Sequence, residues 1–101
     1  MEKFNLITVE LLKANGFEDI TDSDEARFWK KDMGVSDFSE WELCKNGYYL
    51  SMRHNICNSD NEWTLQVDNI TRDSVGCFDI TYTWQFDMLM EVLLLKFRLK
   101  V

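Results

Sequence analysis

The 101-residue chain contains no proline and only four glycines, so its tight turns must be made by Gly, Asn or Asp. Three widely spaced cysteines do not make a disulfide framework and favour reduced thiols in a cytosol. Basic residues are also scarce, since 11 Lys and Arg stand against 18 Asp and Glu, for a net charge of −7. An acidic chain repels phosphate, so direct binding to nucleic acid or to an anionic membrane surface is disfavoured. The favoured partner is a basic protein.

Enzyme and cofactor motifs are missing as well. The chain has no glycine-rich phosphate loop, no serine nucleophile elbow and no metalloprotease motif. His54 and Cys57 form an H-x-x-C pair, but a structural zinc site takes four ligands, and the simpler interpretation is that His54 ends a strand. We therefore expect no enzyme, no metal and no cofactor. No signal peptide is visible at the N-terminus, and we expect a cytoplasmic location in a bacterial host.

The chain does contain enough apolar material for one domain over residues 1–101. Hydrophobic residues make up 46% of it, including seven Phe, four Trp and three Tyr. Such a composition argues against a disordered chain. The domain is expected to bury one core.

The strongest local signal is "EWELCKNGYYLSMRH", in which Asn46-Gly47 separates two runs of residues. A two-residue Asn-Gly loop predicts a β-hairpin with a type I′ turn, and the turn sets the register. One face of the hairpin is then mainly apolar and the other mainly polar. The expected pairs are Lys45–Tyr48, Leu43–Leu50 and Trp41–Met52 on the first face, and Cys44–Tyr49, Glu42–Ser51 and Glu40–Arg53 on the second.

The remaining elements follow from alternation, helical spacing and capping residues. Two further strands alternate apolar and polar residues, as strands of a sheet with one wet side do. The fold class is therefore α+β: an antiparallel sheet of about five strands, with a short N-terminal helix and a long apolar C-terminal helix on one face. The expected elements are a helix over 8–15, an acidic loop over 18–26, a strand over 27–31, strands over 62–68 and 77–83, and a helix over 84–98.

The C-terminal helix carries a second apolar stripe beside the one expected to cover the sheet. On a helical wheel, Met88, Val92, Leu95 and Leu99 recur at i, i+4, i+7 and i+11. Either the first helix and nearby loops cover this stripe, or it is a homodimer or partner surface. A membrane span is not expected, because it needs roughly 20 apolar residues, and acidic residues interrupt this helix.

The acidic residues suggest a second candidate surface. Between Glu18 and Glu42 there are nine acids and only three bases. Either this charge is an ordinary solvated surface, or it is a platform that binds a basic partner. The residues expected to make that contact are Asp22, Asp24 and Glu25 in the loop and Glu40 and Glu42 on the strand.

In its order of elements the chain resembles uncharacterised small α+β proteins of phages and mobile elements of gut bacteria. The resemblance rests on "ITVELLKANGFE" near the start and "TYTWQFDMLMEVLLLKF" near the end. In size and charge the chain also resembles small acidic anti-CRISPR proteins. The resemblance implies a setting, that of small cytosolic accessory proteins, some of which block host defence systems. In that setting the acidic surface favours a non-catalytic binding module that inhibits a nucleic-acid-handling host protein. The alternative is a structural, assembly or self-associating accessory protein of a phage.

Overall fold

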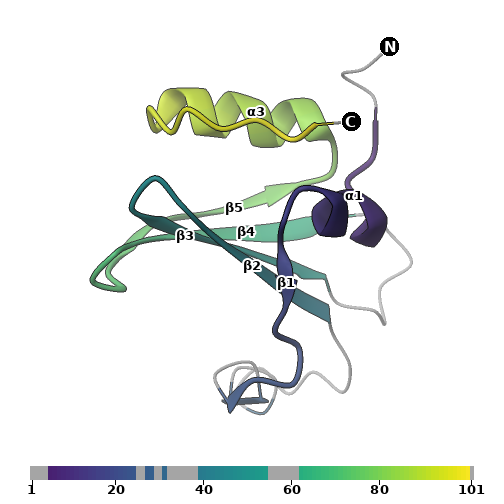
Figure 1. Cartoon of the computed structure of the whole chain (residues 1–101), viewed down its shortest axis with the longest axis vertical. Coiled ribbons are helices and arrows are strands. Elements are labelled where there is room, and N and C mark those ends of the chain that lie inside the picture. The colour runs from purple at the N-terminus through teal and green to yellow at the C-terminus, as the bar shows by residue number, and fades with distance from the viewer. Residues whose placement is uncertain (1–4, 25–26, 29–30, 32–38, 55–61, 101) are drawn as a thin grey trace.

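The computed structural model describes residues 5–24, 27–28, 31, 39–54 and 62–100. Five antiparallel strands form one sheet in the order β1-β2-β3-β4-β5, so each strand pairs with its neighbour along the chain (Figure 1). The predicted α+β class and the five-stranded antiparallel sheet are confirmed. The elements are α1 (Val9–Ala14), β1 (Glu18–Asp19), β2 (Ser39–Lys45), β3 (Tyr48–His54), β4 (Trp63–Asn69), β5 (Ser74–Ile80) and α3 (Thr83–Val92).

The β2–β3 hairpin has the predicted turn and register. Asn46 and Gly47 have φ angles of 52° and 83°, as a type I′ turn requires. All six predicted pairs are present, from Lys45 opposite Tyr48 to Glu40 opposite Arg53. The turn therefore decides which side chains of β2 and β3 face the helices.

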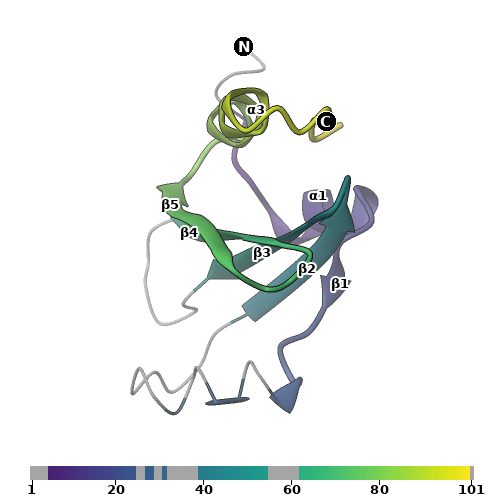
Figure 2. The ribbon, with the colours of Figure 1, turned by 90° about the vertical axis from the view of Figure 1, so that its left-hand side faces the viewer.

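Both helices cover the same face of the sheet and contribute to one hydrophobic core. Figure 2 shows α3 standing over this face. Leu12 of α1 and Phe86 and Met90 of α3 are fully buried in the core. The strands contribute alternate residues to it, as sheet geometry requires. These are Trp41 from β2, Leu50 and Met52 from β3, Trp63, Leu65 and Val67 from β4, and Ile80 from β5.

Helix α1 begins and ends at the predicted residues. The Thr8 hydroxyl accepts a hydrogen bond from the Leu11 amide at 3.1 Å, which satisfies one unpaired donor of the first turn. Gly16 has a φ of 90°, the left-handed conformation that commonly follows a helix. Phe17 then packs back into the core, where its ring meets Phe86 edge-on at 6.3 Å.

Two predictions for the segment after α1 are wrong. The acidic loop is not wholly irregular, because Glu18 and Asp19 pair with β2 as β1. The strand predicted over 27–31 is wrong for the residues described there, since Arg27, Phe28 and Lys31 have helical backbone. The carbonyl of Ser23 accepts the Arg27 amide at 2.9 Å, which is the first helical bond expected of an N-cap serine. This local capping signal outweighs the strand preference of the aromatic residues.

The C-terminal end of β5 and the start of α3 are also shifted from their predicted positions. Strand β5 spans Ser74–Ile80 instead of 77–83. The side-chain oxygen of Gln85 accepts hydrogen bonds from the amides of Thr81 and Tyr82, at 2.7 and 2.9 Å. These amides are thereby satisfied locally, so the chain leaves the sheet and enters α3 after Tyr82.

Helix α3 is short, and the predicted helix over 84–98 is wrong in its second half. Leu94 has a φ of 59°, and its amide bonds to the carbonyl of Glu91 while the amide of Leu95 bonds to Met90. This is a Schellman motif with leucine in the position that usually holds glycine. The sequence has no glycine, asparagine or proline there, which is why the end of the helix is not visible in it.

After α3 the chain turns back and runs alongside the helix (Figure 1). The amide of Leu99 donates to Asp87 Oδ1 at 2.9 Å. Asn15, just after α1, makes two hydrogen bonds to the backbone of Lys100, donating at 3.1 Å and accepting at 2.7 Å. Phe97 packs edge-on against Phe86 at 6.0 Å. Residues 95–100, which we call the returning segment, are thus attached to both α1 and α3.

The first prediction concerns the hairpin turn. Gly47→Val should lower the free energy of unfolding by about 1–3 kcal/mol, because a β-branched residue resists positive φ. A Cβ at position 47 would meet no atom within 4 Å, so the cost comes from the backbone alone. Urea unfolding measures it, with Cys44→Val as a control on the exposed part of the same hairpin. Equal unfolding midpoints for the Gly47 variant and wild type would contradict the turn assignment.

Candidate functional site

The two predicted strand acids are engaged in ion pairs. Glu40 is buried, and its Oε1 is 2.7 Å from Arg53 Nη2 and 3.0 Å from Arg53 Nε. Glu42 is half-buried and lies 3.2 Å from Arg72 Nη1, while the Arg72 guanidinium stacks on Tyr49 at 3.5 Å. Each of these carboxylates therefore has an arginine beside it in the free protein. Contact of Glu40 and Glu42 with a partner stays a prediction.

The loop acids remain exposed. Asp22 and Asp24 are exposed, as are Glu18 and Asp19 just before them, while Glu25 lies outside the described residues. Within the described part of the chain, none of these four acids forms an ion pair. Glu18 and Asp19 belong to β1, which lies beside β2, whereas the segment that follows β1 runs to the end of the molecule farthest from α3 (Figures 1 and 2). We call Glu18, Asp19, Asp22 and Asp24 the acidic end.

Thr21 attaches the acidic end to the sheet. Its hydroxyl donates to Asp19 Oδ1 at 2.6 Å and accepts from the Glu40 amide at 3.0 Å, and its own amide donates to Asp19 at 3.0 Å. The hydrogen bond from the Thr21 side chain, followed by that from its backbone, lowers the pKa of Asp19. Because the folded state lowers this pKa, Asp19 favours folding at neutral pH and loses that effect as pH falls through its folded pKa.

The second prediction tests this attachment. Thr21→Val should raise the pKa of Asp19 and lower the free energy of unfolding at neutral pH by about 1 kcal/mol. The difference from wild type should shrink in strong acid, where Asp19 is protonated in both proteins. Carbon-detected NMR titration and urea unfolding at the two pH values measure these effects. Thr71→Val, in a similar turn after Asn69, is the control and should leave the pKa of Asp19 unchanged.

The predicted apolar stripe is split into two pairs of residues. Met88 and Val92 lie on α3 and are 48% and 71% exposed, whereas Leu95 and Leu99 lie on the returning segment and are 4% and 5% exposed. The stripe therefore does not exist as one surface, because the helix ends before its second half. Instead, Trp84 joins Met88 and Val92 at i, i+4 and i+8, and all three are exposed on one side of α3.

The third prediction compares the two halves of that stripe. Val92→Glu should change the free energy of unfolding by no more than about 0.5 kcal/mol, because the side chain already faces water. Leu95→Glu should cost at least about 3 kcal/mol, because it places a carboxylate in the core. Thermal unfolding, monitored by circular dichroism, measures the change in stability of both variants. Similar melting temperatures for the two variants would contradict the early end of α3.

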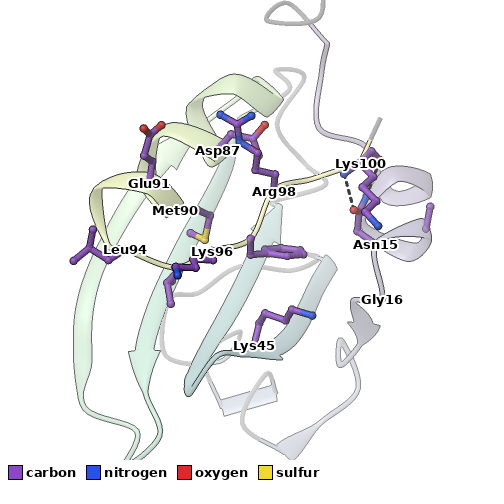
Figure 3. Close-up of a pocket in the computed structure, with 13 residues that line it drawn as sticks. Asn15, Gly16, Lys45, Asp87, Met90, Glu91, Leu94, Lys96, Arg98 and Lys100 are labelled. Carbon is purple, nitrogen blue, oxygen red and sulfur yellow. Dashed lines mark hydrogen bonds between the residues drawn. The ribbon is translucent and has the colours of Figure 1, made fainter.

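A groove of about 1000 Å³ lies between the end of α1, the β2–β3 turn, α3 and the returning segment (Figure 3). Met90, Leu95 and Phe97 contribute apolar atoms to it. Asp87 and Glu91 supply two acids, and Leu94 stands at the end away from Asn15. Four basic side chains also line it, although the whole chain is acidic. They are Lys45, Lys96, Arg98 and Lys100.

The basic residues of the groove were not predicted from the sequence, although a signal was present. In "KFRLK", over residues 96–100, cations alternate with apolar residues. Period-2 alternation is typical of an extended segment with one buried side. Phe97 and Leu99 do face inward, and Lys96, Arg98 and Lys100 are exposed. The apolar residues just before this segment continue the helical pattern, so the change from helical spacing to alternation is hard to recognise in the sequence.

The residues of the H-x-x-C pair are only partly described. The His54 ring lies 5.0 Å from the Trp63 ring, which is a packing contact at the end of β3, and Cys57 is outside the described residues. Cys44 and Cys77 are free and exposed. In the part of the chain that the structure describes, no group of three or more His, Cys, Asp or Glu is placed to hold a metal ion. Neither α1 nor α3, the helices assigned among those residues, is long and apolar enough to cross a membrane.

Comparisons of the chain with family models, with curated proteins and with solved structures find no match.

Proposed function

We propose that the protein is a non-catalytic binding module that docks on a basic, nucleic-acid-handling protein through its acidic end. In the phage or mobile-element setting suggested by the resemblance, the partner is a host defence protein, and docking inhibits it in the manner of a small anti-CRISPR protein. The observation that carries the proposal is the exposure of four acids within seven residues, Glu18 to Asp24, without an ion pair in the described part of the chain.

Carboxylates held on a folded scaffold can occupy a surface that otherwise holds phosphates. β1 pairs with β2, and Thr21 bonds to Glu40, so the acidic end is attached to the sheet and is partly ordered before binding. Preorganisation lowers the entropic cost of docking. Arg27 and Lys31 are exposed a few residues further along the chain. Asp22 and Asp24 are the exposed loop acids that we propose as the centre of the surface. Binding of this kind starts fast and weakens as salt rises.

The fourth prediction tests the acidic end directly. The tagged protein should retain a basic, nucleic-acid-binding protein from bacterial lysate, and added DNA or RNA should displace it. The double variant Asp22→Lys, Asp24→Lys should lose this partner, because the change replaces attraction by repulsion. The affinity of the purified pair should fall at least about tenfold between low and moderate salt.

A matched control separates local from overall charge. Glu10→Lys with Glu91→Lys makes the same change in net charge at two exposed acids on α1 and α3, and it should retain the partner. Retention by both double variants, with an affinity indifferent to salt, would mean that the acidic end only keeps the protein in solution. Equal loss in both would mean that net charge, not this surface, drives the association.

Self-association is the second candidate function, and the exposed row on α3 favours it. Trp84, Met88 and Val92 are 40%, 48% and 71% exposed on one side of the helix, and contiguous apolar patches often mark interfaces. Light scattering over a range of concentrations should then show a dimer for wild type and a monomer for Val92→Glu. A wild-type protein that stays monomeric at high concentration would exclude self-association through this row.

A further inference from the structure

The groove has more basic than acidic side chains in its lining, with four cations and two acids. None of its four cations, Lys45, Lys96, Arg98 and Lys100, forms an ion pair in the described part of the chain. Lys45 Nζ lies 5.7 Å from the centre of the Phe97 ring. Of the two acids, Asp87 already accepts the Leu99 amide. The groove therefore has an excess of two positive charges within a chain of net charge −7.

Leu94 at the edge of this groove is unfavourable in two respects. Its φ of 59° is strained for a leucine and would not be for a glycine. Its side chain is also 87% exposed, so burial of Leu94 itself does not compensate for that strain. The next residue, Leu95, is the one that packs into the core. Leu94 and half-buried Phe97 both line the groove, and together they offer apolar surface that a ligand could cover.

We propose that the groove binds a small amphipathic anion, with an anionic head group on an unbranched apolar chain. The apolar chain covers Leu94 and Phe97, and the head group lies among the basic side chains toward Lys100. Figure 3 shows Leu94 at one end of the groove and Lys100, bound to Asn15, at the other. The volume of about 1000 Å³ is at the upper end of the range for small-molecule sites. A nucleic acid would instead bring its phosphates toward the acidic remainder of the molecule.

The fifth prediction uses decanoate as the probe and ¹⁵N-labelled full-length protein. Decanoate should cause saturable amide shifts at residues 94–100 and 14–16. Decanol has the same chain without the charge, and inorganic phosphate has charge without the chain. Each should bind at least about tenfold more weakly, because it loses one of the two contributions. Decanol or phosphate binding as tightly as decanoate would overturn the proposal, as would decanoate shifts confined to the Trp84 side of α3.

Charge reversal tests the head-group contacts. Arg98→Glu with Lys100→Glu, at the Lys100 end of the groove, should weaken decanoate binding at least about tenfold. Arg27→Glu with Lys31→Glu makes the same change in net charge at exposed positions beside the acidic end, and should leave the affinity within about twofold. An equal loss in the two double variants would show that the groove cations make no specific contact. Failure of the proposed docking function would not affect this result, because the two sites share no residue.

Leu94→Gly tests the apolar contact with a variant that should fold better than wild type. Glycine relieves the positive φ, so the melting temperature should rise by a few degrees. Decanoate should nevertheless bind several-fold more weakly, because its chain loses the exposed leucine. A purely structural role for Leu94 predicts unchanged binding in this variant. A more stable Leu94→Gly protein that binds decanoate as well as wild type would overturn the proposed position of the apolar chain.

Discussion

Positive φ angles at Asn46 and Gly47 close a two-residue turn, and the register of β2 on β3 follows from it. A slip of β3 by one residue against β2 would turn the side chains of β3 to the opposite face. Leu50 and Met52 would then face away from the helices, and the core would lose two fully buried residues. The same register places Glu40 opposite Arg53, so the turn sets the ion pair as well as the core.

The charges of the molecule are paired at some positions and unpaired at others. On the strands, Arg53 and Arg72 pair with Glu40 and Glu42. The four acids of the acidic end form no ion pair in the described part of the chain, and neither do the four cations that line the groove beside α3. The net charge of the chain does not show this distribution.

The early end of α3 creates the groove. Had the helix continued to Arg98, the chain could not have returned past Asp87 to Asn15. The Schellman motif at Leu94 makes that return possible, at the cost of a strained and exposed leucine. Burial of Leu95 and Leu99 offsets the cost, together with the hydrogen bond that Asp87 accepts and the two that Asn15 makes with Lys100. One of the positive-φ residues of the chain thus lies at the edge of the candidate ligand site.

Local steric rules and side-chain alternation are visible in the sequence, and they determined the hairpin register, the caps of α1 and the inward residues of β4 by themselves. The end of α3, the pairing of Glu42 with Arg72 and the groove were decided by tertiary structure. Glu42 and Arg72 are 30 residues apart, and Asn15 and Lys100 are 85 apart. The sequence contains no helix-stop residue after Val92. The physical reason is that a leucine takes positive φ only where packing of its neighbours compensates the strain, and that packing exists only after the sheet, both helices and the returning segment have come together.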